Sequence, residues 1–203
     1  MVRRYSIGIA ILLVALATLC TPLVATAEPK TYRIDPQHTH IVWSVDRFGF
    51  TRTFGSFAGV SGVIHYVADN AAKSTVNVAI DAAALRSDLS LREEILTGPH
   101  WFAVEQWPRI SFETTSVSVA AGESCRGICL NVVGTLTLKG QSAPVTFSAA
   151  INKLGTDPVS GKEALGASAT GELSRRALGL SIADGKIGDI VQFQIEVLAI
   201  AAD

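Results

Sequence analysis

Hydrophobic and polar residues alternate strictly along the last stretch of the chain, from Val191 to Val197, with four apolar side chains on one face and three polar ones on the other. The same alternation returns at 76–80, 130–138 and 145–151. Because successive side chains of a strand point to opposite faces, this pattern predicts β-strands with one buried and one solvated face. The predicted strands are Thr31–Ile34, His38–Val45, Phe54–Val67, Thr75–Ala82, Arg109–Ala120, Cys129–Lys139, Ala143–Leu154, Glu163–Arg175 and Asp189–Ala201.

Short turn segments separate these strands, among them Ala68-Asp69-Asn70, Lys139-Gly140-Gln141 and Asp184-Gly185. Strands that follow one another without intervening helices favour antiparallel pairing. The pattern therefore predicts an all-β domain, either a closed barrel or a sandwich. In a barrel, the buried face can also enclose an apolar ligand.

One window, 90–97, has helical spacing instead. Ser90 is followed three residues later by Glu93, which is the arrangement of a capping box. Apolar residues follow at near-helical spacing, and Gly98-Pro99 ends the segment. We predict one short helix at about 90–97.

The segment after this helix, 100–108, is rich in aromatic residues, with Trp101, Phe102 and Trp107 close together. Side chains of this size need to be covered by other parts of the chain. They either plug one end of a barrel or form a wall of a ligand cavity, and the two roles are compatible.

The first residues carry the pattern of an export signal. Arg3 and Arg4 precede an apolar run at 7–19, and small residues at 25–27 fit a cleavage site. The run is too short for a stable membrane span, although a retained anchor is the alternative. We predict a cleaved signal peptide over 1–27 and a single periplasmic domain over 28–203, of 203 − 27 = 176 residues, without an integral membrane span.

Charge argues against a nucleic-acid partner. Removal of Arg3 and Arg4 with the signal peptide leaves 17 − 2 = 15 basic residues against 18 acidic ones, a net charge of −3. No basic cluster compensates for this balance, and a nucleic-acid-binding surface requires one.

Two cysteines, Cys125 and Cys129, remain after the predicted cleavage. They flank Arg126-Gly127-Ile128, a short glycine-containing link that suits a tight hairpin. Disulfides persist in exported proteins, so we predict a bridge that contributes about 2 kcal/mol. A metal pair is the alternative, but no further cysteine or nearby histidine completes four ligands.

The inward face of the predicted strand 163–175 is unusually small, with Ala167, Ala169 and Gly171 in succession. Small inward residues leave volume for a ligand, unless facing aromatic side chains such as Phe147 and Phe193 fill it. The residues predicted to contact an apolar ligand are Trp43, Val45, Val78, Ile80, Trp101, Phe102, Phe112, Leu136, Phe147, Ala167, Ala169, Phe193 and Ile195.

The histidines give little support to metal or catalytic chemistry. His38 and His40 share one strand face, but it is the polar face and no third ligand stands nearby in sequence, so we predict no metal site. No nucleophile elbow and no glycine-rich nucleotide loop occurs in the chain. We therefore predict no catalytic residue and no cofactor.

Several cationic residues flank strand ends, where a ligand headgroup could meet them. Arginine binds phosphate through paired hydrogen bonds, although most arginines at such positions are merely solvated. The predicted headgroup contacts are Arg47, Arg52, His100 and Arg175.

Motifs along essentially the whole predicted mature chain resemble the YceI-like family, the exported polyisoprenoid-binding proteins of bacteria. The opening is similar to that family's Tyr-x-Ile-Asp-Pro-x-His-Ser/Thr, and a later stretch to its Gly-x-Leu-Thr-Ile-x-Gly. The segments that carry the resemblance are Tyr32–Thr39, Phe50–Gly62, Arg92–Pro108, Gly134–Gly140, Pro144-Val145-Thr146, Arg175 with Leu178-Gly179-Leu180, and Ile187-Gly188-Asp189.

The resemblance implies an eight-stranded antiparallel lipocalin-like β-barrel with one inserted helix. It also implies that the interior holds an isoprenoid tail, from a polyprenyl phosphate or a quinone, without catalysis. The alternative is a small periplasmic enzyme acting on a lipid or quinone through His38, His40 or His100. A homodimer is left open by the sequence.

Departures from the family pattern cluster among polar positions. His100 stands where the family usually has aspartate, Ile95 where it has histidine, and Phe54 where arginine often precedes the glycine. Asp46-Arg47 replaces a common Lys-His pair, and Ala103 and Ala177 replace aspartates. The apolar strands are kept, so these departures bear on the headgroup more than on the tail.

Overall fold

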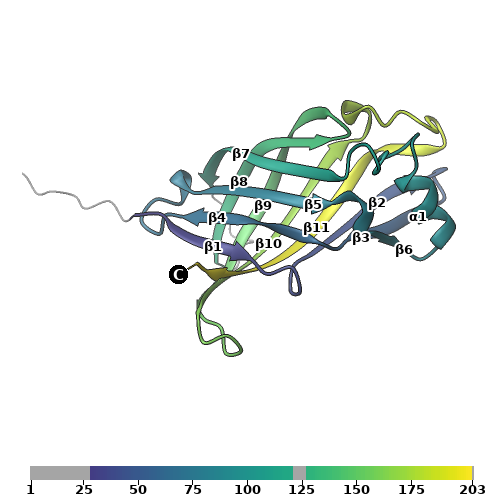
Figure 1. The fold of residues 1–203 in the computed structure, drawn as a ribbon. Helices are drawn as coiled ribbons and strands as arrows, with labels where there is room; N and C mark the ends of the chain where they lie inside the picture. Colours follow the sequence, from purple (N-terminus) through teal and green to yellow (C-terminus); the bar gives the residue numbers. More distant parts are fainter. Residues whose placement is uncertain (1–27, 121–126, 203) are drawn as a thin grey trace, which may run out of the picture.

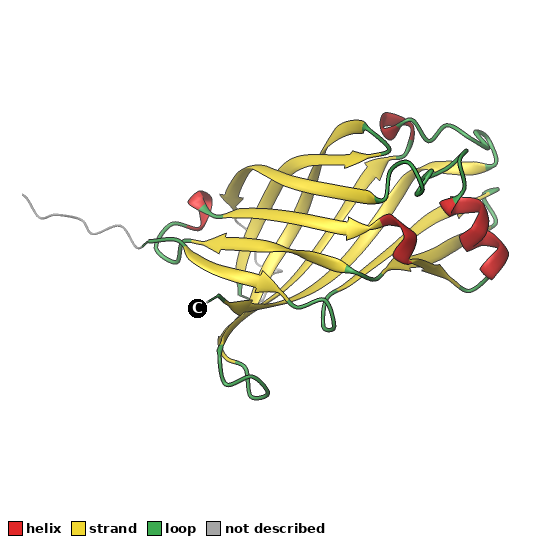
Figure 2. Ribbon diagram, viewed as in Figure 1, coloured by secondary structure: helices red, strands yellow, loops and turns green. Residues whose placement is uncertain are grey.

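The structure, a computed structural model, describes residues 28–120 and 127–202. It consists almost entirely of β-strands, with one α-helix and three short 3₁₀ turns (Figures 1 and 2). The elements are β1 (Lys30–Ile34), β2 (His40–Arg47), β3 (Thr51–Phe57), β4 (Val60–Tyr66), η1 (Ala71–Lys73), β5 (Thr75–Asp81), η2 (Ala82–Ala84), β6 (Leu85–Ser87), α1 (Ser90–Thr97), β7 (Arg109–Val119), β8 (Ile128–Leu138), β9 (Gln141–Thr156), β10 (Glu163–Ser174), η3 (Arg176–Leu178) and β11 (Ile187–Ala201).

The strands close into an eight-stranded antiparallel barrel, as predicted. Its circuit runs β1-β4-β5-β7-β8-β9-β10-β11 and closes through pairing of β11 with β1. The remaining strands extend this circuit at one end, because β2 pairs with β11, β3 with β2, and β6 with β3. β2, β3 and β6 thus follow β11 in the same order as β1, β4 and β5 do in the closed circuit. Each of these pairs of successive strands shares one position in the wall, which makes the barrel longer on that side.

The strand predicted at Phe54–Val67 is two strands in the structure. β3 ends at Phe57 and β4 begins at Val60, and Gly59 between them has a φ of +66°. Backbone in the left-handed region interrupts an extended strand, and glycine adopts it without steric cost. The break lets β3 continue beyond the closed circuit while β4 remains within it.

The strand predicted to begin at His38 begins at His40 instead. Asp35 folds the preceding segment into a turn, because its carboxylate accepts hydrogen bonds from the Gln37 N–H at 2.9 Å and from the His38 ring at 2.6 Å. An aspartate that bonds backbone two residues on is a common turn device. His38 therefore lies outside the strand that carries His40.

The helix occupies the predicted range, but the predicted capping box does not form. Leu89 is the N-cap residue and makes no side-chain cap hydrogen bond. Glu93 Oε1 instead accepts from the backbone N–H of Ser87 at 2.6 Å. Ser87 is the last residue of β6, so this hydrogen bond connects α1 to the end of that strand.

Packed side chains and one polar cluster lie at the end of the barrel opposite α1. Tyr32 and Leu165 at this end are among the largest fully buried side chains of the described residues. The Tyr32 hydroxyl donates to Glu163 Oε1 at 2.5 Å, and Lys30 pairs with the other carboxylate oxygen at 2.5 Å. Burial raises the pKa of Tyr32, and the bond to Glu163 raises it further.

Two predictions fall on residues that the structure does not describe. The signal peptide at 1–27 and the Cys125 half of the predicted disulfide lie outside the described residues, so both stay predictions. Cys129 lies half-buried on β8. No helix within 28–120 and 127–202 is long and apolar enough to cross a membrane.

Candidate functional site

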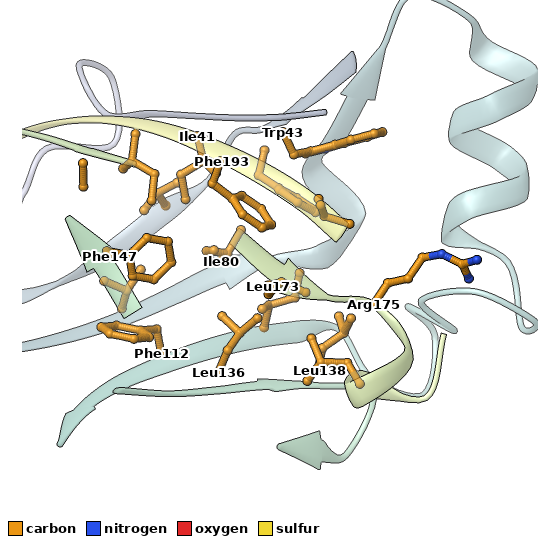
Figure 3. A pocket seen from close by; sticks show the side chains of 18 of the residues that line it. Ile41, Trp43, Ile80, Phe112, Leu136, Leu138, Phe147, Leu173, Arg175 and Phe193 are labelled. Atoms are coloured by element: carbon orange, nitrogen blue, oxygen red, sulfur yellow. The ribbon is translucent and has the colours of Figure 1, made fainter. Parts of the chain in front are cut away.

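The barrel encloses a cavity of about 380 Å³ that opens toward α1. Side chains from nearly every strand of the wall point into it, as Figure 3 shows for Trp43, Phe147 and Leu136. The lining is apolar apart from a few residues. The lining residues with polar side chains are Thr39, Arg47, Thr53, Arg92, Ser168 and Arg175.

All of the residues predicted to contact an apolar ligand line this cavity. They are Trp43, Val45, Val78, Ile80, Trp101, Phe102, Phe112, Leu136, Phe147, Ala167, Ala169, Phe193 and Ile195. A strand alternates its faces throughout its length, so a correct strand assignment places every second side chain inside. Their contact with a ligand stays a prediction.

Three glycines keep large aromatic side chains flat against the wall. A methyl group on Gly55 would lie 2.1 Å from Cζ2 of Trp43, and one on Gly134 would lie 2.4 Å from Cε2 of Phe112. Such distances are far below van der Waals contact, so each ring occupies the place of the missing side chain. The aromatic residues therefore line the interior without filling it.

The third of these glycines, Gly171, lies directly opposite Phe147 on the β10–β9 pair. Phe147 also contacts two other rings edge-to-face, Phe112 at 5.5 Å and Phe193 at 6.5 Å between centroids. Edge-to-face contacts of this kind add stability beyond area burial. The row of rings fixes the middle of the cavity wall in one arrangement.

The structure adds lining residues that the sequence reasoning missed. Val60 and Ile64 project inward from β4, and strict alternation along that strand could have identified them. Leu178 and Leu180 also line the cavity, but they lie in and after η3, outside any strand. No period-two signal exists for such residues, so only the tertiary structure places them.

The aromatic link after α1 forms part of the cavity wall at the open end. Trp101 and Phe102 both line the cavity, and Phe102 contacts Phe57 edge-to-face at 6.0 Å. Trp107 lies elsewhere, where its ring would be 2.8 Å from a methyl group on Gly140. The link thus contributes apolar surface to the cavity wall, which is the second of its two predicted roles.

Arg175 has a structural role instead of the predicted headgroup contact. It is only 3% exposed, and its five N–H groups donate to Gly188 O at 2.8 Å, Ile182 O and Ile187 O at 2.9 Å, Asp184 Oδ1 at 2.8 Å, and Leu180 O. A guanidinium has five such donors, so all of them are used. Arg175 ties the segment between β10 and β11 over the cavity.

The other predicted headgroup contacts separate in space. Arg52 lies on the outer face of β3, where it donates to the Ser44 hydroxyl at 2.8 Å and to Ser44 O at 3.1 Å. His100 is exposed and does not line the cavity. Arg47 does line it, with its guanidinium 4.7 Å from the Phe48 ring centroid. Arg92 of α1, which sequence reasoning did not select, joins Arg47 at the opening.

The candidate acid–base histidines lie outside the cavity. The His38 ring bonds to Asp35, which lowers the pKa of that carboxyl, and His40 is exposed on β2. No group of three potential metal ligands occurs within the described part of the chain. The chemistry at the cavity itself is apolar contact, with cationic groups at one end.

Comparison with protein families and curated sequences gives one consistent result. A family model described as "YceI-like domain" matches residues 32–199. Among curated relatives, Protein YceI of Salmonella arizonae is 28% identical over 184 residues, covering 89% of this chain and 93% of the relative.

Solved structures with the same fold extend this result. BcnA of Burkholderia cenocepacia superposes with a TM-score of 0.70 at 19% identity, covering 81% of this chain and 98% of that one. A Campylobacter jejuni YCEI protein gives 0.64 at 24% identity, covering 73% and 85%. A polyisoprenoid binding domain from Saccharophagus degradans, implicated in plant cell wall breakdown, gives 0.59 at 11% identity, covering 84% and 98%. At these identities the likeness concerns the fold.

Proposed function

The chain belongs to the YceI-like family, and from this premise we propose that it is a non-enzymatic carrier that holds the tail of a polyisoprenoid or an isoprenoid quinone inside its barrel. The predicted signal peptide at 1–27 supports a periplasmic location for this activity. The cavity is the observation that carries the proposal.

The size and lining of the cavity suit a hydrocarbon chain. Its volume of about 380 Å³ falls in the range of small-molecule sites, which is roughly 300–1,000 Å³. Burial of about 400 Å² of isoprenoid surface, at about 25 cal/mol/Å², contributes on the order of 10 kcal/mol. Ordering of the flexible tail and loss of its free motion offset several kcal/mol, so we expect micromolar or tighter binding.

A binding role is better supported than a catalytic one. The family, and one structural relative that is a polyisoprenoid binding domain, both favour binding. An enzyme acting through His38, His40 or His100 would need these rings near the guest, and none of them lines the cavity. If alanine replacement of all three changes cellular function while lipid binding is retained, the enzyme alternative regains support.

The headgroup of the guest would lie at the end of the cavity near α1. Arg47 and Arg92 are the cationic residues that line this end and are not fully committed to backbone carbonyls. Arg92 pairs with Asp88, and Arg47 stacks on Phe48. Either side chain can turn a donor toward a phosphate or a quinone oxygen, whereas the interior beyond them offers apolar contact.

A pair of matched variants tests the proposal. Ala169 faces the cavity on β10, and its neighbour Thr170 is exposed on the opposite face of the same strand. We expect Ala169→Trp to fill the interior and abolish guest binding, and Thr170→Trp to leave binding unchanged. Native mass spectrometry of protein purified from its host, before and after delipidation, measures the bound lipid directly. Repeated recovery of an empty wild-type protein, or equal binding by both variants, would refute the carrier proposal.

A further inference from the structure

Exposed apolar side chains gather around the open end of the cavity. Phe50 is 90% exposed and Phe48 is 46% exposed, both in the β2–β3 turn, and Leu91 and Ile95 are exposed on α1. The turn and α1 lie at the same end of the barrel in Figure 1. The Phe48 N–H also donates to Lys186 O at 2.8 Å, which joins the turn to the segment preceding β11. Single exposed apolar residues are ordinary, but several of them beside a cavity opening are not.

The backbone of the β2–β3 turn, which carries these aromatic side chains, is strained at Phe48. Phe48 has a φ of +56° and Gly49 a φ of +71°, and the Phe50 N–H donates to Arg47 O at 3.1 Å. A tight turn with two successive positive φ values favours Asn-Gly, whereas a bulky residue at the first position is strained. Strain and exposure together favour a role for Phe48 and Phe50 outside the folded core.

An arginine-lined groove of about 670 Å³ lies beside these phenylalanines, over β2, β3 and β6. Arg47, Arg52, Arg86 and Arg92 line it, and Asp88, which pairs with Arg92, is its one acidic lining residue. No carboxylate within 28–120 and 127–202 forms an ion pair with the other three arginines. The groove is therefore a local positive surface on a chain whose predicted mature form has a net charge of −3.

The groove and the cavity meet at the opening. Arg47, Thr53 and Arg92 line both of them, and Ile95 lines the cavity while remaining exposed on its outer side. A guest that leaves the cavity here passes apolar side chains and arginines before it reaches water. The order of apolar and then cationic side chains matches the order of hydrocarbon and then phosphate across a bilayer leaflet.

We propose that this end of the protein docks onto a bilayer that contains anionic phospholipids. The docking rim consists of Phe48, Phe50, Leu91, Ile95 and Phe54, which is exposed on β3 and lines the groove, with Arg47, Arg52 and Arg86 beside them. The apolar side chains enter the interface, and the arginines meet lipid phosphates, which is the division of labour in peripheral membrane binding. Docking rests on the proposed function, because its use to the protein is to let an isoprenoid tail enter the cavity from the bilayer without crossing water.

Vesicle flotation tests the docking rim with matched controls. We expect the wild-type protein to float with vesicles of phosphatidylcholine plus phosphatidylglycerol, and to bind phosphatidylcholine alone weakly. Phe50→Ser should lower the partition coefficient on the order of tenfold, since a large apolar side chain no longer inserts. Val159→Ser is the control, because Val159 is also 90% exposed but lies in the β9–β10 turn, away from α1 (Figure 1).

The arginines are tested in the same assay. Arg86→Gln should lower binding to the anionic vesicles about fivefold, with no effect on binding to phosphatidylcholine alone. Lys73→Gln, at an exposed position in η1 remote from the rim, should leave both unchanged. Added salt should remove the effect of Arg86→Gln, because the interaction with the lipid phosphates is electrostatic.

The outcomes separate docking from guest binding. Ala169→Trp fills the cavity but leaves the docking rim unchanged, so this variant should still bind vesicles. Vesicle binding can therefore be tested even if the carrier proposal fails. Equal effects of Phe50→Ser and Val159→Ser, or no flotation of the wild-type protein at low salt, overturn docking. Binding of inorganic phosphate in the groove without any binding to vesicles would also overturn docking, in favour of a free anion as the occupant. A dimer that Phe50→Ser dissociates would overturn it in favour of a second copy of the chain.

Discussion

Gly171 and Phe147 face each other across the β10–β9 pair, and a methyl group on Gly171 would lie 2.5 Å from Cδ1 of the ring. The ring therefore rests against backbone where another side chain would stand. The same relationship holds between Gly55 and Trp43 and between Gly134 and Phe112. Judged by side-chain volume alone, these aromatic residues could fill the barrel. Because each ring packs against a glycine, a cavity remains between them.

Gly171→Ala should push the Phe147 ring into the cavity. We expect a loss of unfolding free energy of about 1–3 kcal/mol, because the ring must move away from the added methyl group and disturb its contacts with Phe112 and Phe193. Guest binding should weaken in parallel. Urea denaturation and lipid titration measure the two effects. Gly166→Ala, on the same strand with its nearest neighbour at 3.9 Å, should change neither.

Arg175→Gln should destabilise the segment between β10 and β11. The substitution leaves four backbone carbonyls and Asp184 without their donor, so we expect a cost of about 3 kcal/mol or more. Arg176→Gln removes an exposed side chain that pairs with Asp184 and Asp189 at 3.5 and 3.3 Å, and should cost less than about 1 kcal/mol. Hydrogen exchange across 176–187 should rise only in the Arg175 variant.

Stability should fall in acid. Lys30 and the Tyr32 hydroxyl lower the pKa of Glu163, and at Asp189 burial is outweighed by bonds from the Ser174 hydroxyl and the Arg176 N–H, so the pKa falls as well. A lowered folded-state pKa contributes stability that is present above the unfolded value and lost as pH falls through the folded value. The unfolded values are 4.5 for Glu and 3.8 for Asp.

Denaturation midpoints measured from pH 7 to pH 3 check this expectation. The midpoint should change little down to about pH 5 and fall steeply below about pH 4. Asp189→Asn should lower the midpoint at pH 7 and flatten its fall in acid. Asp69→Asn, in the exposed β4–β5 turn, serves as the control, and an equal flattening in that variant would contradict the assignment to Asp189.

A quinone guest should quench tryptophan emission from within the cavity. Trp43 and Trp101 line the cavity near its open end, whereas Trp107 packs beside Gly140 and does not. Titration with an isoprenoid quinone should therefore quench the wild-type protein strongly. Trp43→Phe and Trp101→Phe should each remove part of the response, and Trp107→Phe should remove little. Dominant quenching of Trp107 would place the quinone ring outside the cavity.

The strand pattern by itself determined the class of fold and the sorting of side chains between its two faces. Trp43, Phe112 and Ala169 could be assigned to the interior because side-chain direction along a strand repeats every two residues and depends only on local backbone geometry. The helix at 90–97 was equally visible, since its spacing is also local. The capping box was not a reliable guide, because Glu93 bonds Ser87, a residue brought close by the end of β6.

Tertiary structure alone decided whether the interior is hollow. The space beside Phe147 depends on Gly171 standing opposite it, and that pairing is a matter of register between β9 and β10. The role of Arg175 likewise depends on five acceptors gathered by the segment that follows it, and the outer position of Arg52 depends on Ser44 across the β2–β3 pair. Periodicity records the face on which a side chain lies, whereas contacts between strands follow from how the barrel closes.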